Sequence, residues 1–142
     1  MQKTFKIDSE AQNKQVVEHI LEHYPDGVVI LMSAQLGVGK STFVKSFVHH
    51  LHPATSTSSP TFSLMNEYAN MPKIYHYDLY MDGFERASKL GVWQNLLEDG
   101  YHFIEWADER CEQFLLQNSI RYIWLKITQQ NESRIYEVID ER

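Results

Sequence analysis

Cysteine and long apolar runs are scarce in this sequence, and both absences limit what the protein can be. Cys111 is the only cysteine, so no disulfide can form within the chain, and a reducing cytoplasm is the expected compartment. The longest purely apolar stretch, residues 28–32, is far too short to cross a bilayer. Residues 1–7 contain two lysines and lack the apolar segment of a secretory signal. We therefore expect no membrane association.

Positive charge is scarce as well. The chain has 13 Lys and Arg against 19 Asp and Glu, a net charge of −6, and no cluster of basic residues offsets it. Affinity for DNA or RNA comes largely from Lys and Arg side chains that neutralise phosphates. We therefore expect this chain to contact any nucleic acid only through a partner protein. A single phosphate group remains a possible ligand, because backbone N–H groups can hold it locally.

The composition that is present is typical of a globular domain. The chain has 142 residues, of which 43% are hydrophobic and 23% charged, and this argues for one domain over residues 1–142 with one core. Strand and helix patterns alternate along the chain, and residues 28–32 are typical of a strand buried on both faces of a parallel sheet. The sequence predicts a single α/β domain whose mostly parallel sheet is flanked by helices, with antiparallel strands near its C-terminus.

The apolar patterns and turn residues also place the individual elements. Ser9 and Gln12 fit a capping box at the start of the first helix. The first predicted helix ends near residue 23. Three further helices are predicted at residues 40–51, at 86–97 with an interruption near Gly91, and at 108–117. The predicted strands cover residues 4–7, 28–32, 63–68, 74–79, 102–106, 122–127 and 134–139.

Residues 34–41 carry the strongest functional signal. They read Ala-Gln-Leu-Gly-Val-Gly-Lys-Ser, close to the P-loop pattern G-x-x-x-x-G-K-[ST], and they lie between a predicted strand and a predicted helix. Gly39 lets the backbone approach a phosphate, Lys40 can reach the β- and γ-oxygens, and Ser41 offers a hydroxyl ligand to Mg²⁺. Thr42, in the first helical turn, can reach the α-phosphate. The pattern predicts binding of a nucleoside triphosphate with Mg²⁺ by Gln35, Leu36, Gly37, Val38, Gly39, Lys40, Ser41 and Thr42.

Besides the Ser41 hydroxyl, a P-loop site needs a carboxylate that positions the metal, usually at the end of another core strand. Glu105 ends an apolar strand, and this position suits holding Mg²⁺ directly or through water. Asp78 is placed similarly and could orient the attacking water or share the metal. Each residue could instead be a solvated strand end, and the sequence leaves open which of the two positions the water.

Ser-Pro-Thr-Phe at residues 59–62 follows a loop rich in Ser and Thr, 19 residues past Lys40. P-loop proteins often place there a switch whose threonine senses Mg²⁺ and the γ-phosphate, which makes Thr61 a catalytic candidate. The segment could equally be an ordinary proline-containing entry into a strand.

With these segments in place, the chain resembles the TsaE (YjeE) family, small bacterial ATPases needed to make threonylcarbamoyladenosine in certain tRNAs. The resemblance covers nearly the whole chain. It rests on four ordered segments, namely residues 36–42, 59–62 with 66–68, 76–80 and 104–106. The P-loop alone is not specific to the family, whereas Ser-Pro-Thr-Phe, His-x-Asp-Leu-Tyr and Ile-Glu-Trp in this order are.

The resemblance implies ligands, partners and a role for each matching residue. It implies ATP and Mg²⁺ as ligands, TsaB and TsaD as partner proteins, and contact with tRNA only through that complex. Hydrolysis would keep the complex turning over. Because no arginine lies at an obvious finger position, we also expect slow turnover in isolation. The implied roles are nucleotide binding by Lys40, Ser41 and Thr42, a switch threonine at Thr61, an acidic residue that acts in catalysis at Asp78, Mg²⁺ association at Glu105, and an aromatic residue beside it at Trp106.

Three positions depart from the family. Ala34 stands where the family usually has Gly, and a Cβ there would strain the turn if it needs positive φ. Gln35 stands where Asp or Glu is common, and Met81 replaces a usual Arg after the His-x-Asp-Leu-Tyr segment. Arg86 and Arg134 are the candidates to replace that arginine.

Two other classes of function fit the P-loop. A small-molecule kinase would need an acceptor pocket and usually an arginine-bearing lid, for which 142 residues leave little room. A nucleotide-gated binding module would bind ATP with little hydrolysis. A GTPase is disfavoured, because no Asn-Lys-x-Asp segment occurs.

Overall fold

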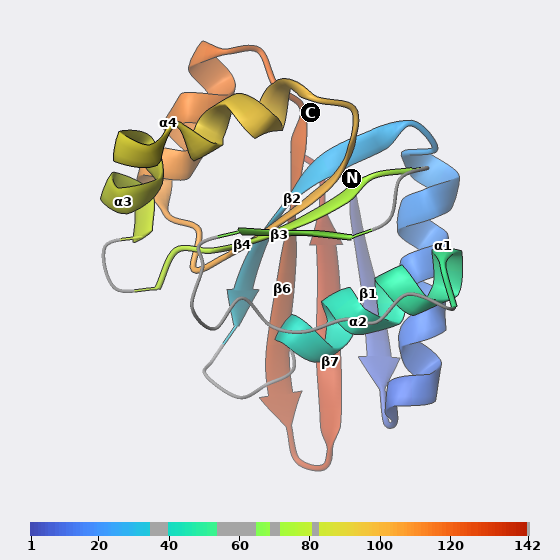
Figure 1. Ribbon diagram of the computed structural model, residues 1–142. Helices are drawn as coiled ribbons and strands as arrows, with labels where there is room; N and C mark the ends of the chain where they lie inside the picture. Colours follow the sequence, from blue (N-terminus) through green and yellow to red (C-terminus); the bar gives the residue numbers. More distant parts are fainter. Residues whose placement is uncertain (35–39, 54–64, 69–71, 81–82, 142) are drawn as a thin grey trace.

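Seven strands form one mixed sheet in the order β1-β7-β6-β2-β5-β4-β3 (Figure 1). The computed structural model describes residues 1–34, 40–53, 65–68, 72–80 and 83–141, with the side chains of residues 40, 41 and 90 excepted. The neighbours β6, β2, β5 and β4 run parallel, whereas β3 and β7 run antiparallel to the strands beside them. The strands are β1 Gln2–Ile7, β2 Gly27–Ala34, β3 Met65–Tyr68, β4 Ile74–Asp78, β5 Gly100–Glu105, β6 Tyr122–Gln130 and β7 Ser133–Ile139.

Helices cover both faces of this sheet and make a three-layer α/β domain (Figure 1). Helices α1 and α2 pack on one face, and α3, η2 and α4 pack on the other. Their bounds are Asn13–His23 (α1), Lys40–Leu51 (α2), Gly83–Leu90 (α3) and Glu109–Gln117 (α4), with 3-10 helices at Glu10–Gln12 (η1) and Val92–Leu97 (η2). The predicted fold is confirmed, including the C-terminal antiparallel pair β6–β7. No helix in the described part of the chain is long and apolar enough to cross a membrane.

Strand β2 lies at the centre because its apolar run serves both faces. Ile30 and Met32 enter the core under α1 and α2, whereas Val29 and Leu31 enter the core under α3 and α4. Alternate side chains of a strand point to opposite faces, so a strand covered on both sides must be apolar at every position. This is the physical reason for the continuous run at residues 28–32.

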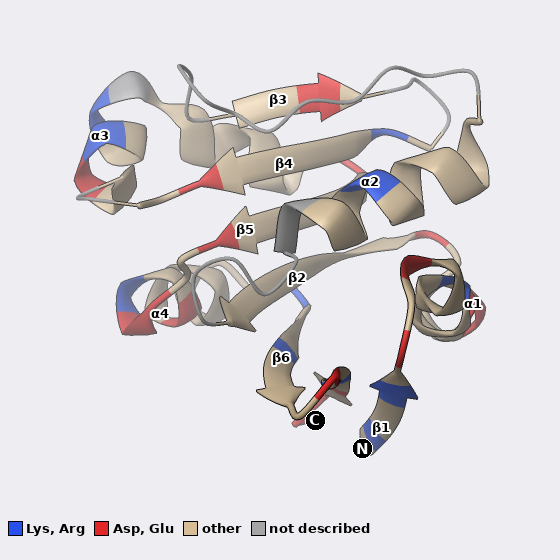
Figure 2. Ribbon diagram, turned by 90° about the horizontal axis from the view of Figure 1, so that it is seen from below, with Lys and Arg blue, Asp and Glu red and all other residues tan. Residues whose placement is uncertain are grey.

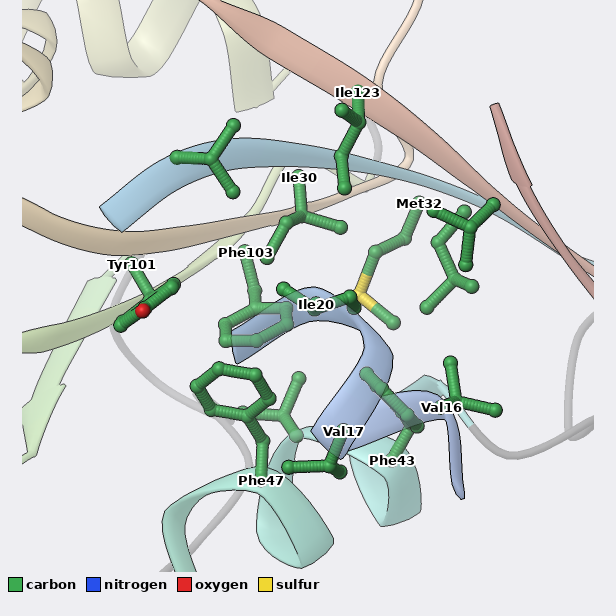
Figure 3. Close-up of a cluster of buried hydrophobic side chains, with 14 of the residues drawn as sticks. Val16, Val17, Ile20, Ile30, Met32, Phe43, Phe47, Tyr101, Phe103 and Ile123 are labelled. Atoms are coloured by element: carbon green, nitrogen blue, oxygen red, sulfur yellow. The ribbon is translucent and has the colours of Figure 1, made fainter. Parts of the chain in front are cut away.

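Aromatic packing attaches α2 to the sheet beside β2. Phe47 lies with its ring centroid 4.9 Å from those of both Phe103 and Tyr101, and Phe43 lies 6.2 Å from Phe103 (Figure 3). Such pairs contribute roughly 0.5–1.5 kcal/mol each beyond the burial of their area. The end of β2 and the start of α2 are therefore both held against the same core, which defines the two ends of the loop between them.

Several element boundaries differ from the predictions, and for three elements the local cause is visible. The Ser9 side chain makes no capping bond; instead Gln12 Oε1 accepts from the Asp8 backbone N–H at 2.5 Å, and the regular helix begins only after a 3-10 turn. The predicted third helix begins earlier, at Gly83, and becomes a 3-10 helix after Gly91, whose φ of 71° breaks the regular geometry. Strand β5 begins at Gly100 and ends at Glu105, because Trp106 leaves the extended conformation with a φ of 63°.

Gly100 sets the close approach of β5 to the chain before β4. Its φ is +133°, and a Cβ there would lie 2.4 Å from the Lys73 carbonyl oxygen, whereas a Cβ on Gly91 (φ +71°) would meet nothing within 4 Å. Both Gly→Ala variants carry a left-handed backbone cost of about 1–2 kcal/mol. Only Gly100→Ala adds a steric clash, so it should lose about 1–3 kcal/mol more stability than Gly91→Ala. Urea unfolding of the two variants tests this, and equal losses would contradict it.

A buried histidine lies on β5 under the α3–α4 layer. His102 is 2% exposed; its Nδ1 accepts from the Tyr77 hydroxyl and its Nε2 donates to the Glu98 carbonyl, both at 2.8 Å. Its ring stacks on Tyr75 at 4.6 Å. Burial lowers the pKa of His102, and the Glu98 carbonyl and charge oppose this only in part. The two hydrogen bonds use both ring nitrogens of the neutral form.

This histidine predicts a loss of stability in acid. Well above pH 6.5, the ring of His102 is neutral in both the folded and the unfolded chain. Its two hydrogen bonds then contribute fully to the free energy of unfolding. As the pH falls toward the lowered folded pKa of His102, the unfolded chain binds a proton that the folded one does not, which costs up to about 1.4 kcal/mol per pH unit. The difference in unfolding free energy between wild type and His102→Gln should therefore shrink from pH 7.5 to 5. The same substitution at the exposed His50 is the control. A pH-independent difference for His102→Gln would show that this ring does not titrate on unfolding.

Candidate nucleotide site

The carboxyl ends of three parallel strands meet at one edge of the sheet. In the register, Met32 of β2 lies beside Glu105 of β5, and Glu105 lies beside Asp78 of β4. Figure 2 shows the ends of β4 and β5 next to each other, each with an acidic residue at its tip. Helix α2 begins at Lys40, six residues after the last residue of β2, Ala34. Open α/β sheets bind ligands at this edge.

Both strand-end carboxylates belong to the face of the sheet that α2 covers. Phe103, two residues before Glu105, and Ile74, four residues before Asp78, both lie in the core under α1 and α2. Since side chains alternate along a strand, Glu105 and Asp78 share that face. The two acidic residues predicted from the sequence are thus neighbours on the same side as the start of α2.

Glu105 is buried and paired. It is 5% exposed, and its Oε2 accepts a hydrogen bond from Nε2 of His76, which is 1% exposed. A buried carboxylate is costly unless a partner donates to it. The interpretation of Glu105 as a solvated strand end is therefore wrong.

Asp78 is half-buried and begins a turn. Its Oδ1 accepts from the Tyr80 backbone N–H at 3.0 Å, and the Leu79 N–H donates to the Glu105 carbonyl at 3.1 Å. An ionised carboxylate has about four acceptor positions, so the Tyr80 bond orients the Asp78 side chain without exhausting its acceptor capacity. This leaves Asp78 able to accept a proton or a hydrogen bond from water.

The side chain of Trp106 lies on the other face of the sheet from Glu105 and Asp78. Its ring is half-buried, packs against the core under α3 and α4, and lies 4.8 Å from the ring of Tyr80 at an angle of 41°. Its φ of 63° is unusual for a bulky side chain, and such conformations, which cost about 1–3 kcal/mol, are concentrated at functional sites. A nucleotide contact by Trp106 stays a prediction.

Several predicted site residues lie outside what the structure describes. Lys40 and Ser41 form the first turn of α2, but their side chains are not described. Thr42 follows them, half-buried, and its carbonyl accepts from Ser46 Oγ at 3.1 Å. The residues wholly outside are Gln35, Leu36, Gly37, Val38, Gly39 and Thr61. Their roles stay predictions.

The donor atoms at the edge fit Mg²⁺. This ion prefers oxygen ligands, keeps several waters, and is usually bound through one or two carboxylates together with substrate phosphates. Glu105 and Asp78 supply carboxylates on adjacent strand ends. Within the described residues, no group of three or more His, Cys, Asp and Glu side chains forms a metal site by itself. Glu105 and Asp78 could hold this ion together with waters and phosphate oxygens.

His76 is the site residue to which the sequence assigned no role. It lies within the motif at residues 76–80, two positions before Asp78 on the same face of β4. Its alternation with Asp78 is a signal in the sequence, but its contact with Glu105 depends on the pairing of β4 with β5.

Two arginines are candidates to replace the arginine that the family usually has at the position of Met81. They lie in different layers, one in a helix and one in the sheet. Arg86 is exposed on α3. Arg134 is half-buried at the start of β7, and its register partner on β6 is Gln129. Gln129 comes two residues after Ile127, which is the register partner of Ala34 at the end of β2. Arg134 therefore lies toward the same edge of the sheet as the end of β2.

A central parallel strand followed in sequence by Gly-Lys-Ser and a helix, with carboxylates at the ends of the next two strands, is the arrangement typical of P-loop nucleotide-binding folds. The family model described as threonylcarbamoyl adenosine biosynthesis protein TsaE matches residues 7–136. The chain belongs to this family.

Individual relatives agree with this assignment. The tRNA threonylcarbamoyladenosine biosynthesis protein TsaE of Aquifex aeolicus is 31% identical over 115 residues, covering 77% of this chain and 81% of the relative. The protein of the same name from Bacillus subtilis is 33% identical over 99 residues, covering 67% of this chain and 62% of its own length. A crystal structure of Bacillus subtilis YdiB superposes with a TM-score of 0.69, covering 99% of this chain and 86% of that one. At 20% identity this likeness shows the fold alone.

Proposed function

We propose that the chain is a Mg²⁺-dependent ATP-binding and hydrolysing subunit required for threonylcarbamoyladenosine modification of tRNA, acting on a complex of TsaB and TsaD. One observation carries the nucleotide site. Glu105 and Asp78 are register neighbours at the carboxyl edge of the sheet, on the face where α2 begins with Lys40 of the P-loop pattern. The family description supports the role in tRNA modification.

In this proposal the phosphates bind at the start of α2. The backbone N–H groups of its first turn and its dipole favour an anion, and Lys40 supplies a charge toward the β- and γ-oxygens. When bound, Mg²⁺ would neutralise charge that develops on the phosphates. Thr61 would contribute from the segment at residues 59–62.

The two carboxylates take different roles because their surroundings differ. Glu105 is buried and held by His76, which suits a carboxylate that faces the metal in one orientation. Asp78 is half-buried with acceptor capacity beyond its Tyr80 contact, which suits a residue that orients the attacking water or accepts its proton. This division is an assignment from burial and hydrogen bonding.

The partners TsaB and TsaD should raise the rate. A P-loop ATPase without an arginine finger leaves the charge of the transition state under-stabilised and hydrolyses slowly. Met81 stands where the family usually has an arginine. We expect slow phosphate release by the protein alone, the same rate with tRNA alone, and a clear rise when the TsaB–TsaD pair is added. Steady-state phosphate release measures all three.

The same assay separates the competing functions. Stimulation by bare tRNA would contradict the proposed route through partners, because the acidic chain should not bind tRNA by itself. Phosphate transferred to a small acceptor would make the protein a kinase. Tight ATP binding with no phosphate release, even with the pair, would make it a nucleotide-gated binding module. Lys40→Ala serves as the blank.

A further inference from the structure

A histidine and a glutamate are paired in the interior between β4 and β5. The register sets His76 beside Phe103, so Glu105, two residues further along β5, is its diagonal neighbour on the same face. Long side chains reach each other across such a diagonal. The side chains of His76 and Glu105 are 1% and 7% exposed, and Nε2 of the ring donates to Oε2 of the carboxylate.

The second ring nitrogen of His76 is buried at a cost in free energy. Nδ1 of His76 is buried and has no hydrogen-bond partner among the described residues. A buried polar atom without a partner carries a cost, and apolar side chains of similar volume often replace buried ion pairs with no loss of stability. By contrast, His102 on the opposite face uses both of its ring nitrogens. Packing alone would therefore favour apolar residues at both positions of the pair, 76 and 105.

We infer that His76 is a positioning residue, which holds the Glu105 carboxylate in the orientation that meets the Mg²⁺–nucleotide. This inference rests on the proposed function. Carboxylates that face a metal are generally hydrogen-bonded by a second residue, and loss of that residue typically costs 10–100-fold in metal affinity or activity. Without the Nε2 donor, the Glu105 carboxylate would lose one of the contacts that fix its orientation.

Two amide variants separate positioning from simple packing. In His76→Gln the amide nitrogen reaches about as far as Nε2, whereas in His76→Asn it falls short by one carbon. The affinity for a fluorescent, non-hydrolysable ATP analogue is measured as a function of free Mg²⁺. The readout is the Mg²⁺ concentration at which half of the Mg²⁺-dependent gain in affinity is reached. His76→Asn should raise this concentration roughly 10–100-fold and His76→Gln by no more than about threefold. In EDTA, where no free Mg²⁺ is present, both variants should bind the ATP analogue with the affinity of the wild type.

Two controls isolate the route through Glu105. His102→Asn removes an equally buried histidine on the other face of the sheet, so it should lower the thermal midpoint while leaving the Mg²⁺ requirement unchanged. In a Glu105→Gln background, His76→Asn should add no further change to the Mg²⁺ requirement, because position 105 then carries no charged carboxylate for His76 to orient toward the metal. Should the Asn variant fail to fold, His76→Met, which fills the space without a donor, takes its place.

The outcomes distinguish this inference from the proposed function. If the wild-type protein shows no Mg²⁺-dependent nucleotide binding, both are overturned. If the wild type binds Mg²⁺–nucleotide and the Asn and Gln variants match it, only the role of His76 is overturned. Additive effects of His76→Asn and Glu105→Gln would also overturn it, since His76 would then act by another route.

Discussion

Replacement of Lys40 by alanine is expected to weaken the binding of a fluorescent ATP analogue by roughly 30- to 5,000-fold, equivalent to about 2–5 kcal/mol. The reason is that Lys40 begins α2 directly after the P-loop glycine, where its ammonium group would pair with phosphate away from bulk water. No other basic residue occurs between positions 34 and 44 to replace that charge.

Lys45 on the same helix is the matched control for this experiment. It is exposed, one turn further along α2, and Lys45→Ala should change affinity only slightly. Circular dichroism would confirm that α2 persists in both variants. Wild-type affinity in Lys40→Ala would mean that residues 34–41 do not bind the triphosphate.

Glu105→Gln should separate chemistry from binding. We expect nucleotide affinity to stay within about tenfold of wild type, or 1.4 kcal/mol, while turnover falls a hundredfold or more, about 2.7 kcal/mol. Glutamine has nearly the same volume, and its amide oxygen can still accept from His76, so the buried pair keeps a hydrogen bond. What the variant loses is the negative charge at the end of β5.

Affinity by titration and single-turnover phosphate release measure the two quantities separately. Glu22→Gln, at an exposed position of α1, is the control for a change of net charge. If affinity and turnover fall equally, Glu105 serves binding instead of chemistry. If neither falls, the role assigned to Glu105 is wrong.

Local patterns were enough to predict the elements that build the site. The apolar run of residues 28–32 predicted a strand buried on both faces, and the Gly-Lys-Ser loop predicted the start of α2 at residue 40, as observed. The alternation in residues 122–127 and 134–139 predicted the pair β6–β7. These predictions succeeded because burial on one or both faces imposes a period of 2 or an unbroken apolar run within a few residues.

Predictions that depended on local hydrogen bonds were less successful. The capping box at Ser9 was wrong because Gln12 bonds to Asp8, one residue earlier, in a 3-10 turn. The start of α3 at Gly83 was missed because it depends on contact with the end of β4, where the Gly83 N–H donates to the Leu79 carbonyl at 3.0 Å. Side-chain and backbone partners of this kind compete over energies of about 1 kcal/mol.

The sequence by itself determined which class of site to expect, because the P-loop pattern at residues 34–41 is contiguous and its residue types follow from phosphate chemistry. It also determined which two carboxylates end core strands. Only the tertiary structure decided that Glu105 and Asp78 are neighbours on the face of α2, that Glu105 is buried, and that His76 donates to it. These facts depend on the pairing of β4 with β5 across more than twenty residues of chain. Such pairing is chosen by the packing of the whole sheet, and no local pattern encodes it.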